Sequence, residues 1–342
     1  MAIRDMTEHS TQRTVTILAL WGTPLSSVAV PLDVFSSAAH MCKTIFETEA
    51  KPPFDVRVAS VDGKPIPVMG GVTVGVHCGI DDVHSSDLVL ISALINAPES
   101  RAQLPKAIAW IKARHAAGSK IAGLCTGAFV LAATGLLDGK AATTHWGACR
   151  RFSAMFPKVK LLPHRLLVDE SPLYTSGGSH GASDLCFYLV ENILDRHTAL
   201  DWSRVLVKDF RSATQSPYAV FSGNRKHTDR EIASVQDFLE EGYAAPLSVA
   251  TMAERAGLGK RTFERRFKAA TGEPPLIYLQ RLRVEAAKRI LETENDSVEQ
   301  ITCRVGYEDS ATFSRLFLRY VGLPPAAYRR KFTAPETPFE AG

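Results

Sequence analysis

The stretch SVATMAERAGLGKRTFERRFKAATG, residues 248–272, and the stretch SVEQITCRVGYEDSATFSRLFLRYVG, residues 297–322, are two copies of one pattern. In each copy, Ser-Val begins a short amphipathic segment that ends at a glycine, Gly257 or Gly306. A few turn residues follow, and a second segment then carries two phenylalanines four positions apart. Apolar side chains at that spacing share one face of a helix. Each copy therefore predicts two helices joined by a tight turn and packed on a small apolar core.

A helix, a turn that contains glycine and a second helix form the helix-turn-helix motif, whose second helix enters the DNA major groove. We place the motifs at about 248–270 and 297–320, inside an all-α domain over residues 229–333. The run 276–291 between them has helical periodicity. Asp229 is the expected N-cap of a further helix, which covers the first motif.

The distribution of charge supports contact with double-stranded DNA. Residues 247–331 hold 16 Lys and Arg against 10 Asp and Glu, whereas the rest of the chain holds 24 against 26. The basic excess is therefore confined to the repeated pattern, as contact with phosphate requires. A solvated helical bundle would show the same excess, so the paired motif carries the interpretation and the charge supports it.

Side chains opposite the phenylalanines of each second helix are the candidates for contact with DNA. Arginine can form two hydrogen bonds with guanine, so Arg265 and Arg315 are expected at base edges. Lys260, Lys268 and Arg319 are expected at phosphates. The complete expected set is Lys260, Arg261, Glu264, Arg265, Lys268, Ser310, Ala311, Ser314, Arg315 and Arg319. In the alternative interpretation, each of these residues is an ordinary solvated surface group.

The C-terminal region resembles the AraC/XylS family of transcription regulators over its whole length. The resemblance rests on the stretches 261–267, 278–283, 313–317, 322–324 and 328–332. It implies that one chain places two recognition helices in adjacent major grooves. It also implies activation of transcription through contact with RNA polymerase as the more usual output, with repression as the other possibility.

Residues 12–210 alternate between apolar and amphipathic stretches, which predicts a separate α/β domain. Strands are expected at 15–20, 54–60, 72–76, 88–91, 120–124, 141–144 and 173–175, and helices at 27–40, 104–116, 127–134 and 182–194. Continuous apolar strands form a parallel sheet with helices on both faces, as in the flavodoxin-like fold. Residues 211–228 lack a sustained period and are expected to be a linker.

Composition narrows the class of protein. The chain of 342 residues is 45% apolar and 22% charged, which is typical of a soluble protein with two domains. Its first dozen residues are polar and are not expected to be a signal peptide, and no run is expected to span a membrane. Six cysteines without a C-x-x-C pair fit reduced thiols in the cytoplasm. We expect neither a metal site nor a cofactor, because His77, Cys78 and His84 lack a second spaced pair of ligands.

The segment GLCTG, residues 123–127, follows the fifth expected strand with the spacing of a nucleophile elbow. Its glycines let the sheet and helix backbones approach, and its central side chain projects near a helix N-terminus. Another expected strand ends at His145, which can reach the same crevice, and a third ends at Gly177 with His180 shortly after. Ligands of parallel sheets bind at such strand ends.

These residues resemble the class I glutamine-amidotransferase-like superfamily, which includes intracellular proteases, deglycases and chaperone-like proteins. Cys125 falls on its elbow cysteine and His145 on its partner histidine. The run 125–140, together with Thr143–Trp146, looks more narrowly like the sensor domain of GlxA-type AraC regulators, in which this fold precedes the two helix-turn-helix motifs. The combined resemblance covers about residues 14–332.

Three departures from the enzymes of the superfamily bear on chemistry. The enzymes carry a glutamate in the first strand-to-helix loop, where this chain has Ser27. They carry Pro-Gly-Gly, whose N–H groups help to build an oxyanion hole, where this chain has residues 92–94, Ser-Ala-Leu. No carboxylate stands beside His145 in the sequence to complete a triad. The chain is therefore expected not to be an enzyme, since nucleophile, base and oxyanion site are needed together.

We expect instead a pocket for a small, nitrogen-containing metabolite, lined by Cys125, Thr126, His145, Trp146, Ser27, Ser92, Gly177 and His180. In the alternative interpretation these residues only fill the core or its loops. Binding of this effector is expected to change how a homodimer matches two DNA half-sites. The rival function is a cysteine-dependent hydrolase or amidotransferase-like enzyme fused to a DNA-binding domain. A purely architectural DNA-binding protein is a third possibility.

Overall fold

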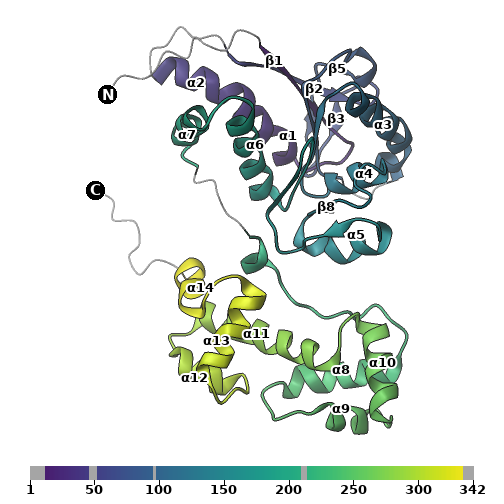
Figure 1. The fold of residues 1–342 in the computed structure, drawn as a ribbon, viewed down its shortest axis with the longest axis vertical. Helices are drawn as coiled ribbons and strands as arrows, with labels where there is room; N and C mark the ends of the chain where they lie inside the picture. Colours follow the sequence, from purple (N-terminus) through teal and green to yellow (C-terminus); the bar gives the residue numbers. More distant parts are fainter. Residues whose placement is uncertain (1–11, 46–51, 95–97, 209–213, 334–342) are drawn as a thin grey trace. The chain divides into compact units, whose positions relative to one another are not determined.

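The computed structural model describes residues 12–45, 52–94, 98–208 and 214–333 (Figure 1). The chain divides into two compact units between Gln215 and Ser216, so the first unit continues past residue 210. Among the described residues, no helix combines the length and the apolar character that a membrane span needs.

A seven-stranded sheet in the order β10-β11-β7-β6-β1-β2-β5 forms the centre of the first unit. The strands are β1 (Arg13–Leu18), β2 (Phe54–Ser60), β5 (Cys78–Gly79), β6 (Leu88–Ile91), β7 (Lys120–Gly123), β10 (Leu167–Glu170) and β11 (Leu173–Ser176). All neighbours are parallel except β10, which is antiparallel to β11 at one edge. Later strands are added on either side of the β1–β6 pair, which is the flavodoxin-like order. The predicted fold class is confirmed.

Helices cover both faces of this sheet (Figure 1). One face carries α1 (Ser26–Leu32), a π-helical turn (Asp33–Ser37), α2 (Ala38–Ile45), α6 (Ser179–Ile193) and α7 (Arg196–Val205). The other face carries α3 (Pro98–Ala116), α4 (Gly127–Ala133) and α5 (Cys149–Met155). Ile17 of β1 packs in the core under α1, α2, α6 and α7, and Leu18 packs in the core under α3, α4 and α5. The two residues differ because successive side chains of a strand point to opposite faces of the sheet. This explains why the central strands are apolar at every position.

Several short elements lie outside the main sheet. They are the hairpin β3 (Ile66–Pro67) and β4 (Thr73–Val74), the parallel pair β8 (Ala141–Ala142) and β9 (Lys160–Leu161), and 3-10 turns at Ile80–Asp82, Trp146–Ala148 and Ser216–Tyr218. The segment 141–144, expected as a strand of the main sheet, is thus mostly a loop. The hydroxyls of Thr143 and Thr144 there bond the carbonyl oxygens of Arg165 and Cys125.

The second unit is all-helical, as predicted. It contains α8 (Arg230–Gly242), α9 (Val249–Arg255), α10 (Lys260–Thr271), α11 (Pro275–Thr293), α12 (Val298–Arg304), α13 (Ser310–Val321) and α14 (Pro325–Phe332). The pairs α9–α10 and α12–α13 are the two helix-turn-helix motifs. Phe263 and Phe267 are fully buried in one core, and Phe313 and Phe317 in another. Helix α11 contributes to both cores and so joins the motifs (Figure 1).

The two motifs also share their helix ends. Ser248 and Ser297 cap α9 and α12, and Asp229 caps α8 as predicted. Helices α10 and α13 end at Gly272 and Gly322, which have φ angles of +88° and +77°. Glycine adopts this left-handed conformation without the steric penalty of a β-carbon. The repeated residues of the sequence are therefore repeated start and stop signals.

Candidate ligand site and DNA-binding surface

The turn between β7 and α4 is a tight elbow with Cys125 at its centre. Cys125 has a φ of +54°, which is rare for a residue other than glycine. A β-carbon on Gly123 would lie 2.9 Å from the backbone of Ala128, and one on Gly127 would lie 2.5 Å from the carbonyl oxygen of Ile91. Both positions therefore require glycine, and the elbow geometry that the GLCTG spacing predicts is present.

We define the strand-end site as Cys125, Thr126, His145 and Trp146, whose side chains all remain partly exposed. Burial raises the pKa of the Cys125 thiol, and hydrogen bonds from Thr126 oppose this shift only in part. A thiol is nucleophilic as the thiolate, so this shift disfavours the nucleophilic form of Cys125. Within the described residues, no hydrogen bond joins the Cys125 thiol to the ring of His145, whose Nδ1 accepts from the N–H of Gly147.

Backbone N–H groups at the end of β6 are already engaged by side chains. The N–H of Ala93 donates to Ser27 Oγ at 2.6 Å, and the N–H of Leu94 donates to Thr126 Oγ1 at 2.9 Å. The N–H groups of Ala93 and Leu94 lie in the segment that forms the oxyanion hole in the enzymes that this chain resembles. A developing oxyanion would have to displace both bonds.

Two of the expected pocket residues form the buried wall behind the strand-end site. Ser27 is 6% exposed and Ser92 is fully buried. Ser92 Oγ accepts a hydrogen bond from the N–H of Leu20 at 3.0 Å, and Ser27 Oγ accepts the one from Ala93. Ser92 thus connects to the loop after β1, and Ser27 connects the start of α1 to the loop after β6, at the point where the sheet changes its direction of winding.

His145 is held in one tautomer by its own loop. Its Nδ1 accepts a hydrogen bond from the N–H of Gly147 at 3.1 Å, so Nε2 carries the proton of the neutral ring. Burial lowers the pKa of this imidazole, which favours the neutral form at physiological pH. The ring of Trp146 lies beside it, with the ring centroids 5.2 Å apart. The site therefore offers one N–H donor next to an aromatic face.

Helix α6 begins next to His145. A β-carbon on Gly178, its N-cap, would lie 3.1 Å from His145 Cδ2, and this N-cap residue has no side chain with which to cap the helix. The first N–H groups of a helix favour an anionic group. Gly177 is buried, and His180 is in the first turn of α6, but the side chain of His180 lies outside the described part of the structure.

Gln215 is a residue of this region that sequence reasoning missed. It is 2% exposed, and its Nε2 donates to the carbonyl oxygen of Thr144 at 2.8 Å. Its Oε1 accepts from the N–H of Trp146 at 3.0 Å, and a β-carbon on Gly177 would lie 2.7 Å from the same oxygen. The residue stands in a segment without periodicity, so no sequence pattern marks it. Only the fold brings it beneath the strand-end site.

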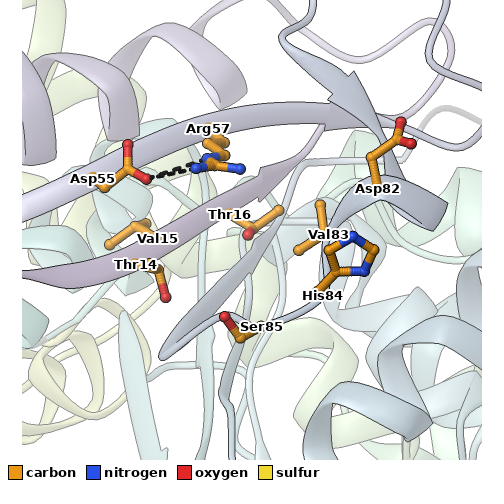
Figure 2. A pocket seen from close by; sticks show the side chains of 9 residues that line it. All are labelled: Thr14, Val15, Thr16, Asp55, Arg57, Asp82, Val83, His84 and Ser85. Carbon is orange, nitrogen blue, oxygen red and sulfur yellow. Dashed lines mark hydrogen bonds and ion pairs between the residues drawn. The ribbon is translucent and has the colours of Figure 1, made fainter.

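A hollow of about 150 Å³, which we call the strand-start hollow, lies toward the opposite ends of the strands (Figure 2). Its lining is Thr14, Val15, Thr16, Asp55, Arg57, Asp82, Val83, His84 and Ser85. The Arg57 guanidinium pairs with Asp55 at 3.0 Å, and Asp82 accepts from the N–H of Gly79 at 3.0 Å. Because these charges are already engaged, we favour the strand-end site as the place for a ligand.

Helices α10 and α13 present the expected DNA-contacting residues at the surface. Lys260, Arg261, Glu264, Arg265, Lys268, Ala311, Arg315 and Arg319 are exposed, and Ser310 and Ser314 are half-buried. The ion pairs found among the described residues do not include Lys260, Arg265 or Lys268. These cations are therefore available to a nucleic acid.

The neighbouring Arg266 has a different position. Its guanidinium donates to Asp229 at 2.6 and 2.9 Å and to Glu231 at 2.7 Å. The hydrogen bond from Arg266 is the main cause that lowers the pKa of Asp229. Arg266 thus connects α10 to the start of α8 and holds the recognition helix on the side that faces α8.

Comparison with known proteins gives the same two parts. The profile of the DJ-1/PfpI family matches residues 13–192, and that of a helix-turn-helix domain matches residues 252–331. The HTH-type transcriptional regulator CdhR of Pseudomonas aeruginosa is 27% identical over 278 residues, which cover 81% of this chain and 79% of CdhR. The HTH-type transcriptional regulator GlxA of Rhizobium meliloti is 27% identical over 215 residues, which cover 63% of this chain and 66% of GlxA.

A solved structure agrees with these relatives. A protein from Vibrio parahaemolyticus, described as a candidate transcriptional regulator, is 25% identical with a TM-score of 0.50, and the match covers 57% of this chain and 100% of that one. The DJ-1/PfpI match alone spans more than half of the sequence. The chain belongs to the DJ-1/PfpI family and, through its C-terminal helix-turn-helix domain, is a DNA-binding transcription regulator of the AraC type.

Proposed function

We propose that the strand-end site binds a small, nitrogen-containing metabolite without turnover, and that this binding controls how the regulator engages DNA. One observation carries the proposal. The elbow and the imidazole are retained, while Ser27 and Thr126 occupy the N–H groups of Ala93 and Leu94. Catalysis requires donors that are free to meet the charge of a transition state. A site with its donors occupied is better suited to recognition.

The polar groups of the site define the chemistry of the ligand. The Nε2–H of His145 and the N-terminus of α6 favour a carboxylate. The ring of Trp146 offers a face on which an alkylated ammonium group can pack. A compound with a carboxylate and a cationic nitrogen, such as an amino acid or a betaine, meets both requirements.

Isothermal titration of the full-length protein with a panel of amino acids, amines and betaines tests this. At least one member should bind, and both His145→Gln and Trp146→Ala should weaken it about tenfold or more, because each removes one recognition element. The matched control His84→Gln changes a histidine of the strand-start hollow and should leave the affinity unchanged. The proposal fails if no member binds, or if the two variants bind as the wild type does.

We further propose that the regulator binds two half-sites as a homodimer. As an activator, it would contact RNA polymerase. Two similar half-sites are matched most simply by a protein with two-fold symmetry. Sedimentation of the protein with a DNA duplex selected for binding measures the stoichiometry. Two chains for each duplex are expected, and a single chain at saturation would contradict the dimer.

The left-handed conformation of Cys125 favours a second candidate, a thiol-dependent hydrolase. That function needs a reactive thiolate, whereas burial raises the pKa of this thiol. At neutral pH, iodoacetamide should therefore modify the exposed Cys303 well before Cys125. Mass spectrometry of the alkylated peptides measures the two labelling rates. Faster labelling of Cys125 than of Cys303 would favour the hydrolase over the binding site without turnover.

A further inference from the structure

The carboxamide of Gln215 joins two loops of the first unit, residues 143–146 and residues 163–165. Besides Thr144, its Nε2 approaches the carbonyl oxygens of Pro163 and Arg165 at 3.0 and 3.2 Å. Its own N–H donates to the carbonyl oxygen of His164 at 3.0 Å. A buried amide with so many partners holds its neighbours in one arrangement. The loop that carries His145 and Trp146 is therefore fixed in part by this side chain.

The six residues that follow Gln215, residues 216–221, belong to the second unit. We call this segment the strap. Lys288 Nζ of α11 donates to the carbonyl oxygen of Ala219 at 2.6 Å, and Glu285 accepts from the N–H of Phe221 at 3.2 Å. The Arg281 guanidinium lies over the Phe221 ring, 4.3 Å from its centroid. The strap is thus attached to the helix that joins the two helix-turn-helix motifs.

This attachment uses a buried ion pair. The side chains of Lys288 and Glu285 are only 4% and 11% exposed, and they lie 3.2 Å from each other. Each also bonds the backbone of the strap. Loss of the strap would leave two buried polar groups without part of their hydrogen bonding, which is unfavourable. The strap is therefore a bound part of the DNA-binding domain.

We propose that Gln215 is a positioning residue that couples the strand-end site to the DNA-binding domain. This inference rests on the function proposed for that site. Gln215 is anchored in the first unit, and the next residue, Ser216, already belongs to the anchored strap. Pro217 then restricts the backbone on both of its sides. A shift of the loop that carries Trp146 displaces Gln215, and the directly bonded Ser216 passes this displacement to the strap and so to α11.

Coupling is reciprocal, so it can be measured without the effector. The probe is a DNA duplex that in vitro selection with this protein has enriched. Hydrogen exchange of the full-length protein is followed with and without this duplex, at the amides of residues 143–147. In the wild type, DNA should change the exchange rate of these amides about fivefold or more. An insertion of Gly-Ser-Gly-Ser between Gln215 and Ser216 keeps every anchor contact and should abolish that change.

Two substitutions complete the experiment. Gln215→Glu replaces the amide donor by an oxygen that faces three carbonyl oxygens, and it should also remove the effect of DNA. The matched control Thr214→Val removes a hydrogen bond to His164 O in the same segment but not the contact with residues 143–146, so its response should match the wild type. The inference is overturned if DNA leaves these amides unchanged in the wild type, or if the insertion preserves the change. Titration with the metabolite panel is a separate measurement, so failure of the proposed ligand is distinguishable.

Discussion

Two adjacent arginines on α10 show how much a single position decides. Arg265 is exposed and has no carboxylate partner among the described residues, whereas Arg266 is bonded to Asp229 and Glu231. Neighbouring residues of a helix point about 100° apart, so one side chain faces outward and the next faces the supporting helix. Identical side chains therefore have different roles.

The first prediction at this scale is that Arg265→Ala weakens binding to the preferred duplex by about 1–3 kcal/mol and relaxes selectivity at one base pair. Arginine discriminates guanine through two hydrogen bonds, which alanine cannot form. Fluorescence anisotropy with duplexes that differ by one base pair measures both effects. An equal loss on every duplex would instead assign Arg265 to a phosphate.

The elbow requires glycine at position 127. Gly127→Ala should destabilise the first unit by about 1–3 kcal/mol or more, because its β-carbon would lie 2.5 Å from a carbonyl oxygen. All four tryptophans of the chain lie before residue 215, so tryptophan fluorescence during urea denaturation reports on this unit. Gly75→Ala is the control, since nothing lies within 4 Å of its β-carbon and its stability should change by less than about 0.5 kcal/mol. Equal stability of the two variants would contradict the elbow geometry.

Among the helices, the start of α8 is bonded to one face of α10. Asp229 caps α8 through the N–H of Ile232 and accepts two hydrogen bonds from Arg266. The first function holds the helix end, and the second fixes the recognition helix against α8. One carboxylate therefore links a local signal of the sequence to a contact that only the fold creates.

Asp229→Asn should separate these functions, because asparagine also caps helices well but cannot form the ion pair. The pKa of Asp229 is lowered in the folded protein, so its contribution to stability is present above the ordinary pKa of Asp and is lost as the pH falls through the folded value. The variant should be less stable by about 1 kcal/mol at pH 7, and the difference should shrink below about pH 4. Urea denaturation followed by circular dichroism measures this. A difference that is independent of pH would rule out the ion pair as its cause.

Across the whole molecule, basic residues are concentrated in the region of the two helix-turn-helix motifs. The excess of basic residues lies in 247–331, while the remainder is slightly acidic. The two units, residues 1–215 and 216–342, have the same net charge, with 21 Lys and Arg against 19 Asp and Glu in the first and 19 against 17 in the second. The local concentration of cations in 247–331, and not the net charge of a unit, is therefore what attracts DNA. Release of counterions makes this attraction depend on salt.

Lys268→Ala should reduce the slope of log affinity against log salt concentration by about 1, because one phosphate contact is lost. Lys106→Ala makes the same change of charge in α3, where the lysine pairs with Asp81, and should leave the slope unchanged. Anisotropy titrations over a range of salt concentrations give both slopes. An equal reduction in both variants would mean that net charge, and not contact, governs binding.

Local patterns of the sequence determined the elements and their ends. The Phe263–Phe267 and Phe313–Phe317 spacings, the serine caps and the glycine stops each act within a few residues, so they predict both helix-turn-helix motifs. The segments expected at 54–60 and 88–91 are β2 and β6 for the same reason. The GLCTG spacing likewise predicts the elbow, because both glycines serve a close approach of neighbouring elements.

Tertiary structure alone decided which distant groups meet. The bonds from Ser27 to Ala93 and from Gln215 to Thr144 join residues 66 and 71 positions apart, and no periodic pattern connects them. The same holds for the segment 141–144, whose place beside the elbow depends on hydrogen bonds to Cys125 and Arg165. Hydrogen bonds between loops follow from the packing of the sheet, which the sequence specifies only through the whole chain. The sequence by itself therefore shows a DNA-binding chain with a cysteine elbow, and the fold shows that the donors beside that elbow are occupied.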